Sequence, residues 1–237
     1  MANHKRIRIF AGPNGSGKST LKNLIESSFK IGIYVNADEI LSKIRNTSRL
    51  AFDEYNITVS EDSLKEKYAQ WPLKNDCNNW LFESNGITIR GDVDGYFASF
   101  LADFIRNTLL ETADRFSFET VMSHPSKLEF IKNAKLKDYK VYLYFISLPD
   151  PALNILRVQT RVQAGGHDVD SVKIRDRYYR TMDLLLDAIK LCDNAYIFDN
   201  SSSRPQLISR KENGELRTEG TLIPQWYQTY VLDKINK

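Results

Sequence analysis

The sequence of 237 residues predicts an α/β fold, a three-layer sandwich in which a five-stranded, mainly parallel sheet carries helices on both faces. Two observations predict it. Short runs of β-branched and aromatic residues alternate with amphipathic helical segments, which is typical of parallel sheets because parallel strands are joined by helical crossovers. A glycine-rich stretch also joins the first strand-like run to the first helical segment.

The glycine-rich stretch spans residues 12–19 and follows an apolar run at residues 7–11. Its spacing matches the P-loop pattern, in which backbone N–H groups and the next helix N-terminus surround a polyphosphate. Lys18 is placed to reach the β- and γ-phosphates, and the Ser19 hydroxyl is placed to complete a Mg²⁺ shell. We therefore expect a P-loop NTPase fold that binds ATP or GTP with Mg²⁺. The expected nucleotide-binding residues are Gly12, Pro13, Asn14, Gly15, Ser16, Gly17, Lys18, Ser19 and Thr20.

The other elements follow from periodicity, taken in chain order. Strand-like runs occupy residues 32–36, 115–120, 139–148 and 195–199. Helical segments occupy residues 37–44, 96–113, 126–134, 151–163 and 171–191. Residues 205–210 and 216–219 are expected to pair as an edge hairpin around Asn213-Gly214, because Asn-Gly is a preferred two-residue hairpin turn.

We expect one kinase-like domain over residues 1–237, with two specialised segments. Periodicity weakens over residues 46–114, where only 63–70, 80–90 and the long helix at 96–113 suggest elements. This segment is interpreted as a helical insertion on the substrate side. Residues 150–192 are interpreted as a helical lid, since two arginine-rich helices flank Gly165-Gly166.

Polar side chains follow several predicted strands, and the carboxyl ends of strands in open parallel sheets are where ligands bind. Asp38, Glu119 and Asn200 occupy such positions beside the glycine loop. Asp38 is suited to accept the proton of an acceptor hydroxyl. Glu119 is suited to hold Mg²⁺ through water or to bind the acceptor, and Asn200 to contact the nucleotide. For both acids the alternative is a favourable interaction with a helix dipole.

The lid segment carries Arg157 and Arg161 four residues apart, and the next helix carries further basic residues. Such side chains can close over a nucleotide and bring positive charge to its γ-phosphate. The alternative is that they are solvated helix faces. For His167, beside the two glycines, a hinge or capping role is as compatible with the sequence as catalysis. The further basic residues are Lys173, Arg175, Arg177 and Arg180.

Composition sets the remaining expectations. The net charge is +3 and no polybasic tract is present, which gives no support for nucleic-acid binding. Cys77 and Cys192 lack metal-site spacing and are expected to be free thiols in a reducing compartment. No apolar run reaches membrane-spanning length and the first strand begins almost at Met1, so we expect a cytoplasmic protein without a membrane contact.

Several motifs occur together in an order that resembles the zeta-toxin-like P-loop kinases, in particular the branch described as predicted ABC-type ATPases. They are the glycine loop, Asn36 to Ile40, Phe118 to Ser123, and the run from Arg157 through Gly165-Gly166-His167-Asp168 to Tyr178. The resemblance covers residues 6–45 and 115–202. It does not extend to residues 46–114. The Leu-Ser-Gly-Gly-Gln signature and the Walker B run, both of which an ABC ATPase requires, are missing from the sequence.

The resemblance implies phosphorylation of a small-molecule hydroxyl, which in the toxins belongs to UDP-N-acetylglucosamine, and a possible antitoxin as protein partner. By position it implies that Asp38 is the general base, with Lys18 at the phosphates. Glu119 with Thr120 and Ser123 would lie in the substrate site. Arg161, with Arg175 or Arg177, would supply the lid arginines.

Two alternatives to a small-molecule kinase stay open. One is an ATPase or nucleotide-dependent switch, in which Asp38 would orient water. The other is a nucleic-acid-end kinase, with insertion residues contacting phosphates. Acidic residues interspersed among these bases argue against the second alternative. The bases are Arg49, Lys65, Lys67 and Lys74.

Overall fold

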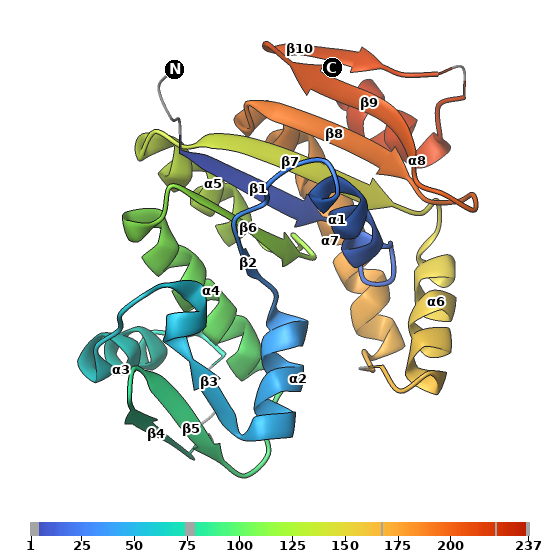
Figure 1. Ribbon diagram of the computed structural model, residues 1–237. Helices are drawn as coiled ribbons and strands as arrows, with labels where there is room; N and C mark the ends of the chain where they lie inside the picture. Colours follow the sequence, from blue (N-terminus) through green and yellow to red (C-terminus); the bar gives the residue numbers. More distant parts are fainter. Residues whose placement is uncertain (1–4, 74–78, 167, 221, 236–237) are drawn as a thin grey trace. The chain divides into compact units, whose positions relative to one another are not determined.

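The computed structural model describes residues 5–73, 79–166, 168–220 and 222–235 (Figure 1). The chain forms two compact units. The first comprises Met1–Ile31 and Glu119–Lys237, and the second comprises Gly32–Phe118.

The first unit is built on a sheet with the strand order β10-β9-β8-β7-β1. Strands β1 (Arg6–Ala11), β7 (Lys140–Ser147) and β8 (Asn194–Asp199) are parallel. Strands β9 (Gln206–Glu212) and β10 (Glu215–Thr218) form an antiparallel hairpin at the edge. Nearly all of β1 and β7 is buried, as expected for central parallel strands that are covered on both faces.

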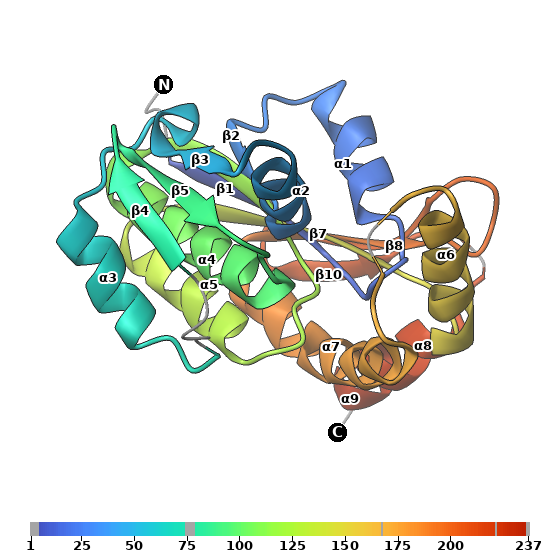
Figure 2. The ribbon, with the colours of Figure 1, turned by 90° about the horizontal axis from the view of Figure 1, so that it is seen from below.

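Helices cover both faces of this sheet. Helix α1 (Lys18–Glu26) lies on one face, and α5 (Ser126–Leu136) and α7 (Ser171–Leu191) lie on the other (Figures 1 and 2). Helix α6 (Pro151–Gln163) packs beside α7. The C-terminal turns α8 (Gln225–Tyr227), η2 (Gln228–Leu232) and α9 (Asp233–Ile235) follow, and η2 packs on α7. The inner face of α7 is buried and includes Tyr178, Met182, Leu185 and Ile189.

The second unit combines a parallel strand pair with an antiparallel sheet. Strand β2 (Ile33–Val35) pairs with β6 (Arg115–Thr120), whose last two residues belong to the first unit. Helix α2 (Ala37–Thr47) packs on α4 (Gly95–Thr112). Between them the chain forms the short turn η1 (Phe52–Tyr55), helix α3 (Glu61–Ala69) and the sheet β3-β5-β4. Its strands are β3 (Arg49–Ala51), β4 (Asn79–Glu83) and β5 (Gly86–Arg90).

The five expected parallel strands and the expected helices are all present, which confirms the α/β fold. The description of residues 46–114 as helical needs a correction, because the segment also contains a three-stranded antiparallel sheet. Ser84 and Asn85 have φ of 46° and 48°, the left-handed values that a tight two-residue hairpin turn requires. Strand β3 has only three residues and pairs with residues 86–88, so its local sequence carries too little periodicity to reveal it.

Among the described residues, no helix combines the length and the apolar character needed to cross a lipid bilayer. Cys192 is a buried free thiol whose pKa is raised to about 12 by burial. Cys77 and Lys74 lie outside the described residues.

Candidate nucleotide-binding site

The glycine loop joins the buried end of β1 to the N-terminus of α1. Gly17 takes the N-cap position of α1 with φ of 101°, a left-handed conformation that is costly for residues with a side chain. A Cβ at Gly17 would lie 2.4 Å from Nδ2 of Asn200. The loop therefore needs glycine here both for backbone conformation and for space.

Asn200 holds the glycine loop from the end of β8. Its Nδ2 donates to the carbonyl of Ser16 at 2.8 Å, and its backbone N–H donates to Ser147 at the end of β7. Its own carbonyl accepts a 2.8 Å hydrogen bond from Arg157 of α6. Asn200, expected to contact the nucleotide, is thus buried and bound to the loop itself. Arg157 is engaged with the backbone beside the loop.

Lys18 and Ser19 begin helix α1, directly after the loop. The Lys18 ammonium is half-buried and donates to the carbonyl of Pro13 at 3.0 Å, which folds the side chain back over the loop. Ser19 and Thr20 are exposed. Because the first N–H groups of a helix lack intrahelical partners, this end of α1 offers both free donors and positive potential to an anion.

The end of β6 lies against the loop through Thr120. The Thr120 carbonyl accepts a 3.3 Å bond from the N–H of Gly12, and its Oγ1 accepts a 3.0 Å bond from the N–H of Met122. Met122 is buried with φ of 59°, so the chain turns sharply after the strand. Both oxygens of Thr120 therefore shape the turn. Glu119 and Ser123 flank it and are half-buried.

The lid segment consists of α6, the Gly165-Gly166 turn and the first turns of α7. Asp150 and Asp170 cap the two helices through their carboxylates. The Gly166 N–H donates to the carbonyl of Arg161 and ends α6. The side chains of Arg161 and Arg175 are exposed and that of Arg177 is half-buried. His167 lies outside the described residues.

Helix α7 is anchored at the rim by two side chains one turn apart. The Tyr178 hydroxyl donates to the carbonyls of Leu148 and Pro149 after β7. The Thr181 hydroxyl donates to the carbonyl of Val121 after β6, at 2.8 Å. Burial raises the pKa of Tyr178, so its hydroxyl stays protonated and remains a donor. This part of α7 is tied to the segments that follow β7 and β6, and the second of these carries Ser123.

Asp38 belongs to the second unit, in the first turn of α2. The cap of this helix is Asn36, whose Oδ1 accepts from the N–H of Asp38 at 2.9 Å. The carboxylate of Asp38 is therefore not used as the cap, and the side chain is exposed. Its assignment as general base stays a prediction.

Two features of the site were not anticipated from the sequence. Asn154 of α6 is fully buried and its Nδ2 donates to the carbonyl of Asn14 at 2.6 Å. Asp199 accepts from the indole N–H of Trp226 at 2.7 Å and from the N–H of Ser201 at 2.9 Å, which fixes the residue before Asn200. The local sequence signal for the role of Asn154 is a polar residue on the otherwise apolar, buried face of α6. The contact between Asp199 and Trp226 has no local sequence signal, because the two residues are 27 positions apart.

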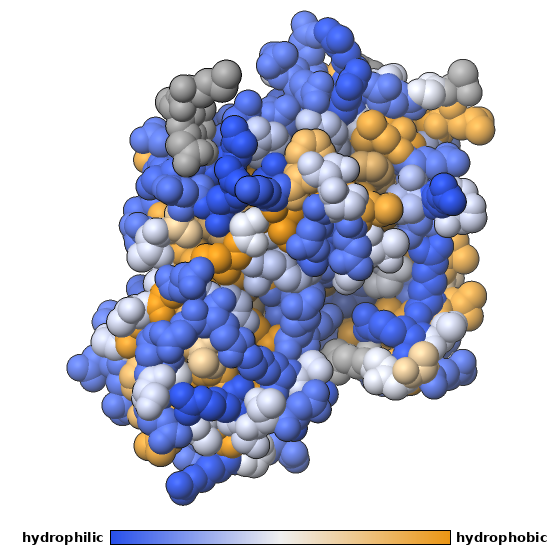
Figure 3. All heavy atoms as spheres, in the orientation of Figure 1, coloured by the Kyte–Doolittle hydropathy of each residue, from blue (hydrophilic) through white to orange (hydrophobic). Residues whose placement is uncertain are grey.

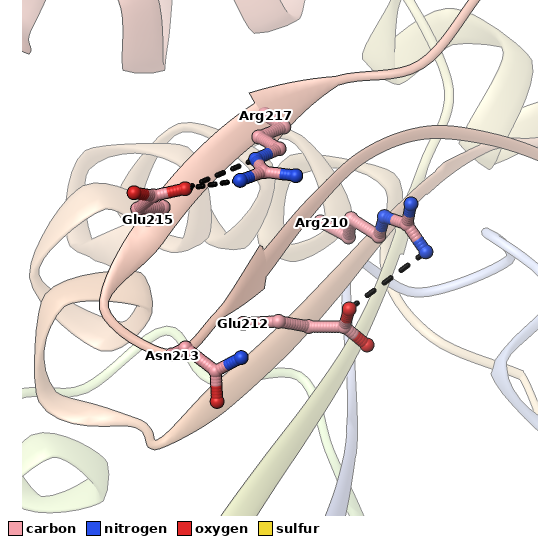
Figure 4. A pocket seen from close by; sticks show the side chains of 5 residues that line it. All are labelled: Arg210, Glu212, Asn213, Glu215 and Arg217. Carbon is pink, nitrogen blue, oxygen red and sulfur yellow. Dashed lines mark hydrogen bonds and ion pairs between the residues drawn. The ribbon is translucent and has the colours of Figure 1, made fainter.

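A shallow polar pocket of about 250 Å³ lies on the β9–β10 hairpin (Figure 4). The surface over this hairpin is mostly hydrophilic (Figure 3). Its cations have acidic partners: Arg217 pairs with Glu215, and Arg210 with Glu212 and Glu219. Lys211, between the pocket residues Arg210 and Glu212, lies opposite Ala195 in the antiparallel register of β9 and β8. Ala195 is near the start of β8, so the pocket lies toward the amino ends of the parallel strands. The glycine loop lies at their carboxyl ends, and the two sites are separate.

These contacts define the first unit as a P-loop-type unit, with a glycine loop between β1 and α1 that is held by Asn154 of α6 and by Asn200 after β8. Searches of family models and of curated proteins find no match. Solved structures do match. A chain of the AvrRxo1-ORF1:AvrRxo1-ORF2 complex with ATP has a TM-score of 0.55 and 13% identity, over 91% of this chain and 61% of that one.

A second match is to the PezAT chromosomal toxin-antitoxin system of Streptococcus pneumoniae. Its TM-score is 0.51 at 14% identity, over 84% of this chain and 69% of that one. The present chain thus spans less than two thirds of the AvrRxo1 complex chain that it matches. At these identities the likeness shows the fold, and it confirms the P-loop kinase-type architecture expected from the resemblance to zeta-toxin-like kinases.

Proposed function

We propose that this protein is a kinase of the zeta-toxin-like group that transfers the γ-phosphoryl group of ATP or GTP to a hydroxyl of a small molecule. The observation that carries the proposal is the glycine loop. Its phosphate-binding sequence occupies the strand-to-helix position that the motif requires, and Asn200 and Asn154 bind two of its carbonyls. The match to a complex solved with ATP supports nucleotide binding.

Phosphoryl transfer requires positioning, charge neutralisation and a group that receives the acceptor proton. In the proposed site the loop N–H groups and Lys18 bind the phosphates. Arg161, with Arg175 or Arg177, places positive charge near the group in transfer. Asp38 removes the proton of the acceptor hydroxyl, and Glu119 and Ser123 line the acceptor side.

Mg²⁺ would be held by Ser19 and Glu119 together with the phosphates. A hydroxyl and a carboxylate are the hard oxygen donors that this ion takes, and Mg²⁺ in kinases is usually held by few protein ligands, so the residue types fit. When bound, the ion would neutralise charge on the β- and γ-phosphates. Ser19 is exposed at the start of α1, and Glu119 is half-buried near the end of β6.

The described residues of the second unit give no support for a nucleic-acid substrate. Of the four basic residues considered for phosphate contacts, Arg49 pairs with Glu83 at 3.4 Å and Lys65 with Glu61 at 2.8 Å. Such paired charges do not form the continuous positive stripe that tracks a phosphate backbone. We infer a small-molecule acceptor, with nucleotide sugars such as UDP-N-acetylglucosamine as the first candidates, and a cytoplasmic location where ATP is available.

The deciding experiment is a screen of nucleotide sugars, sugars and nucleosides with labelled ATP or GTP and Mg²⁺, read out as a labelled acceptor. Lys18→Ala serves as the inactive control. A labelled product that the control does not form supports the kinase. Release of inorganic phosphate with every acceptor tested, and no labelled product, would instead establish the ATPase alternative.

A protein partner of the antitoxin type is a further part of the proposal. It is supported by the match to the PezAT toxin-antitoxin system. Its test is expression of this chain alone and with the products of adjacent reading frames. Growth arrest that a neighbouring product relieves, together with co-purification, supports it; normal growth at full expression of active kinase contradicts it.

A further inference from the structure

Two buried amide side chains bind alternate carbonyls of the glycine loop. Asn154 of α6 donates to the carbonyl of Asn14 at 2.6 Å, and Asn200 after β8 donates to the carbonyl of Ser16 at 2.8 Å. Asn154 has no exposed surface and Asn200 very little. The loop is therefore held from two sides, by a lid helix and by a strand end.

The geometry of the peptide bond links each held carbonyl to the next N–H. In a trans peptide the C=O and the following N–H point in opposite directions. The structure contains no cis peptide bond among its described residues. Because Asn154 draws the Asn14 carbonyl toward α6, the N–H of Gly15 points away from α6. The bond from Asn200 directs the N–H of Gly17 in the same manner, and these N–H groups are donors that a P-loop offers to phosphates.

Packing alone does not explain an asparagine at position 154. Its Oδ1 is buried and has no hydrogen-bond partner among the described residues, which is unfavourable for a polar atom. A leucine has a similar size and would bury no unpaired oxygen. The Nδ2 bond to the loop carbonyl is the interaction that accounts for the amide.

We propose that Asn154 is a positioning residue for the nucleotide phosphates, acting through the Asn14 carbonyl to orient the Gly15 N–H toward them. The proposal rests on the proposed function, since it concerns the same nucleotide site. It assigns to α6 a part in shaping the phosphate loop, in addition to carrying Arg161 at the other end of the lid helix.

The test compares Asn154→Leu with wild type in binding ATP, inorganic tripolyphosphate and adenosine, by calorimetry for the first two and by ligand-observed NMR for adenosine. We expect the affinities for ATP and tripolyphosphate to fall about tenfold, the effect of one misdirected hydrogen-bond donor, with adenosine binding unchanged. A general loss of structure would lower all three affinities together. In a variant whose circular dichroism shows a native fold, an equal loss of all three affinities, or unchanged binding of ATP and tripolyphosphate, would overturn the proposal.

The matched control is Tyr227→Phe, which removes another buried hydrogen bond of the same unit, from the Tyr227 hydroxyl to Ser209 at 2.7 Å. It is expected to lower the melting temperature without changing any of the three affinities. If Asn154→Leu does not fold, Asn154→Ala is measured against the same outcomes. Wild-type protein that binds neither ATP nor tripolyphosphate refutes the proposed function itself, whereas wild-type binding with an unaffected variant refutes only the role of Asn154.

Discussion

The guanidinium group of Arg157 donates a 2.8 Å hydrogen bond to the backbone carbonyl of Asn200, whose side chain in turn binds the carbonyl of Ser16. Two successive bonds thus connect α6 to the glycine loop. Arg157 is a member of the arginine-rich lid, and from its sequence position a phosphate contact was one of two interpretations. The structure shows it bound to the backbone that holds the loop.

The Arg157–Asn200 contact predicts the effect of Arg157→Met, which keeps an unbranched side chain and removes the donor. We expect ATP affinity to fall roughly fivefold, because the loss of a hydrogen bond of about 1 kcal/mol loosens Asn200 and hence the loop. Calorimetry measures it, with Arg217→Met on the β9–β10 hairpin as the control for loss of charge. ATP affinity that falls equally in both variants would mean that net charge, not the contact, is responsible.

The 2.4 Å approach of Asn200 predicts that Gly17→Ala disturbs the loop. The matched control is Gly220→Ala, since Gly220 also has a left-handed φ, 78°, but no neighbouring atom within 4 Å of its added Cβ. Both substitutions carry a backbone cost of about 1–2 kcal/mol. Only Gly17→Ala also displaces Asn200, so it should abolish nucleotide binding, whereas Gly220→Ala should only lower the melting temperature. Binding retained by Gly17→Ala contradicts the close-contact argument.

Lys18→Ala is expected to abolish nucleotide turnover while leaving the fold intact. The side chain is half-buried and donates to the Pro13 carbonyl at 3.0 Å, and the proposed role of its charge is to bind the phosphates. Turnover and circular dichroism are the measurements. Lys22→Ala, four residues further along the same helix, removes a lysine paired with Glu26 and should behave as wild type. Turnover of Lys18→Ala within about tenfold of wild type would refute the assignment of this lysine.

Arg161→Ala tests the lid. If this arginine stabilises charge that develops during transfer, kcat should fall by about 10²-fold or more while nucleotide affinity changes little. Its side chain is exposed near the end of α6. Single-turnover rates and calorimetric affinities separate the two effects, with Arg217→Ala as a control. An equal loss of affinity with an unchanged rate would make Arg161 a ground-state anchor.

Asp38→Asn distinguishes a general base from a helix-terminal charge. If Asp38 is the general base, the amide of the Asn variant has the same size but cannot accept the proton of the acceptor hydroxyl. Transfer to the acceptor should then fall by about 10²-fold or more, while ATP binding stays near normal. Because Asn36 caps α2, the substitution leaves the cap in place. Glu39→Gln removes the adjacent first-turn carboxylate and controls for the helix dipole. Unchanged transfer by Asp38→Asn would remove this residue from the mechanism.

The sequence by itself determined the fold class, the order of its main strands and helices, and the phosphate loop. These depend on local information: hydrophobic period, turn residues, and a motif whose residues are adjacent in the chain. The strand that ends at Ala11, the loop and the helix from Lys18 needed no distant partner to be recognised. The Asn213-Gly214 hairpin was predictable for the same reason.

Only the tertiary structure decided how the loop is held. Asn154 and Asn200 are 140 and 184 residues away from the carbonyls that they bind, and Trp226 reaches Asp199 across 27 residues. Strand β3 likewise exists through pairing with residues 86–88. Local periodicity carries no information on such pairs, because a polar side chain on a helix has the same pattern whether it faces water or a buried carbonyl. Burial and the need to satisfy a backbone oxygen separate the two cases, and both arise only when the chain is folded.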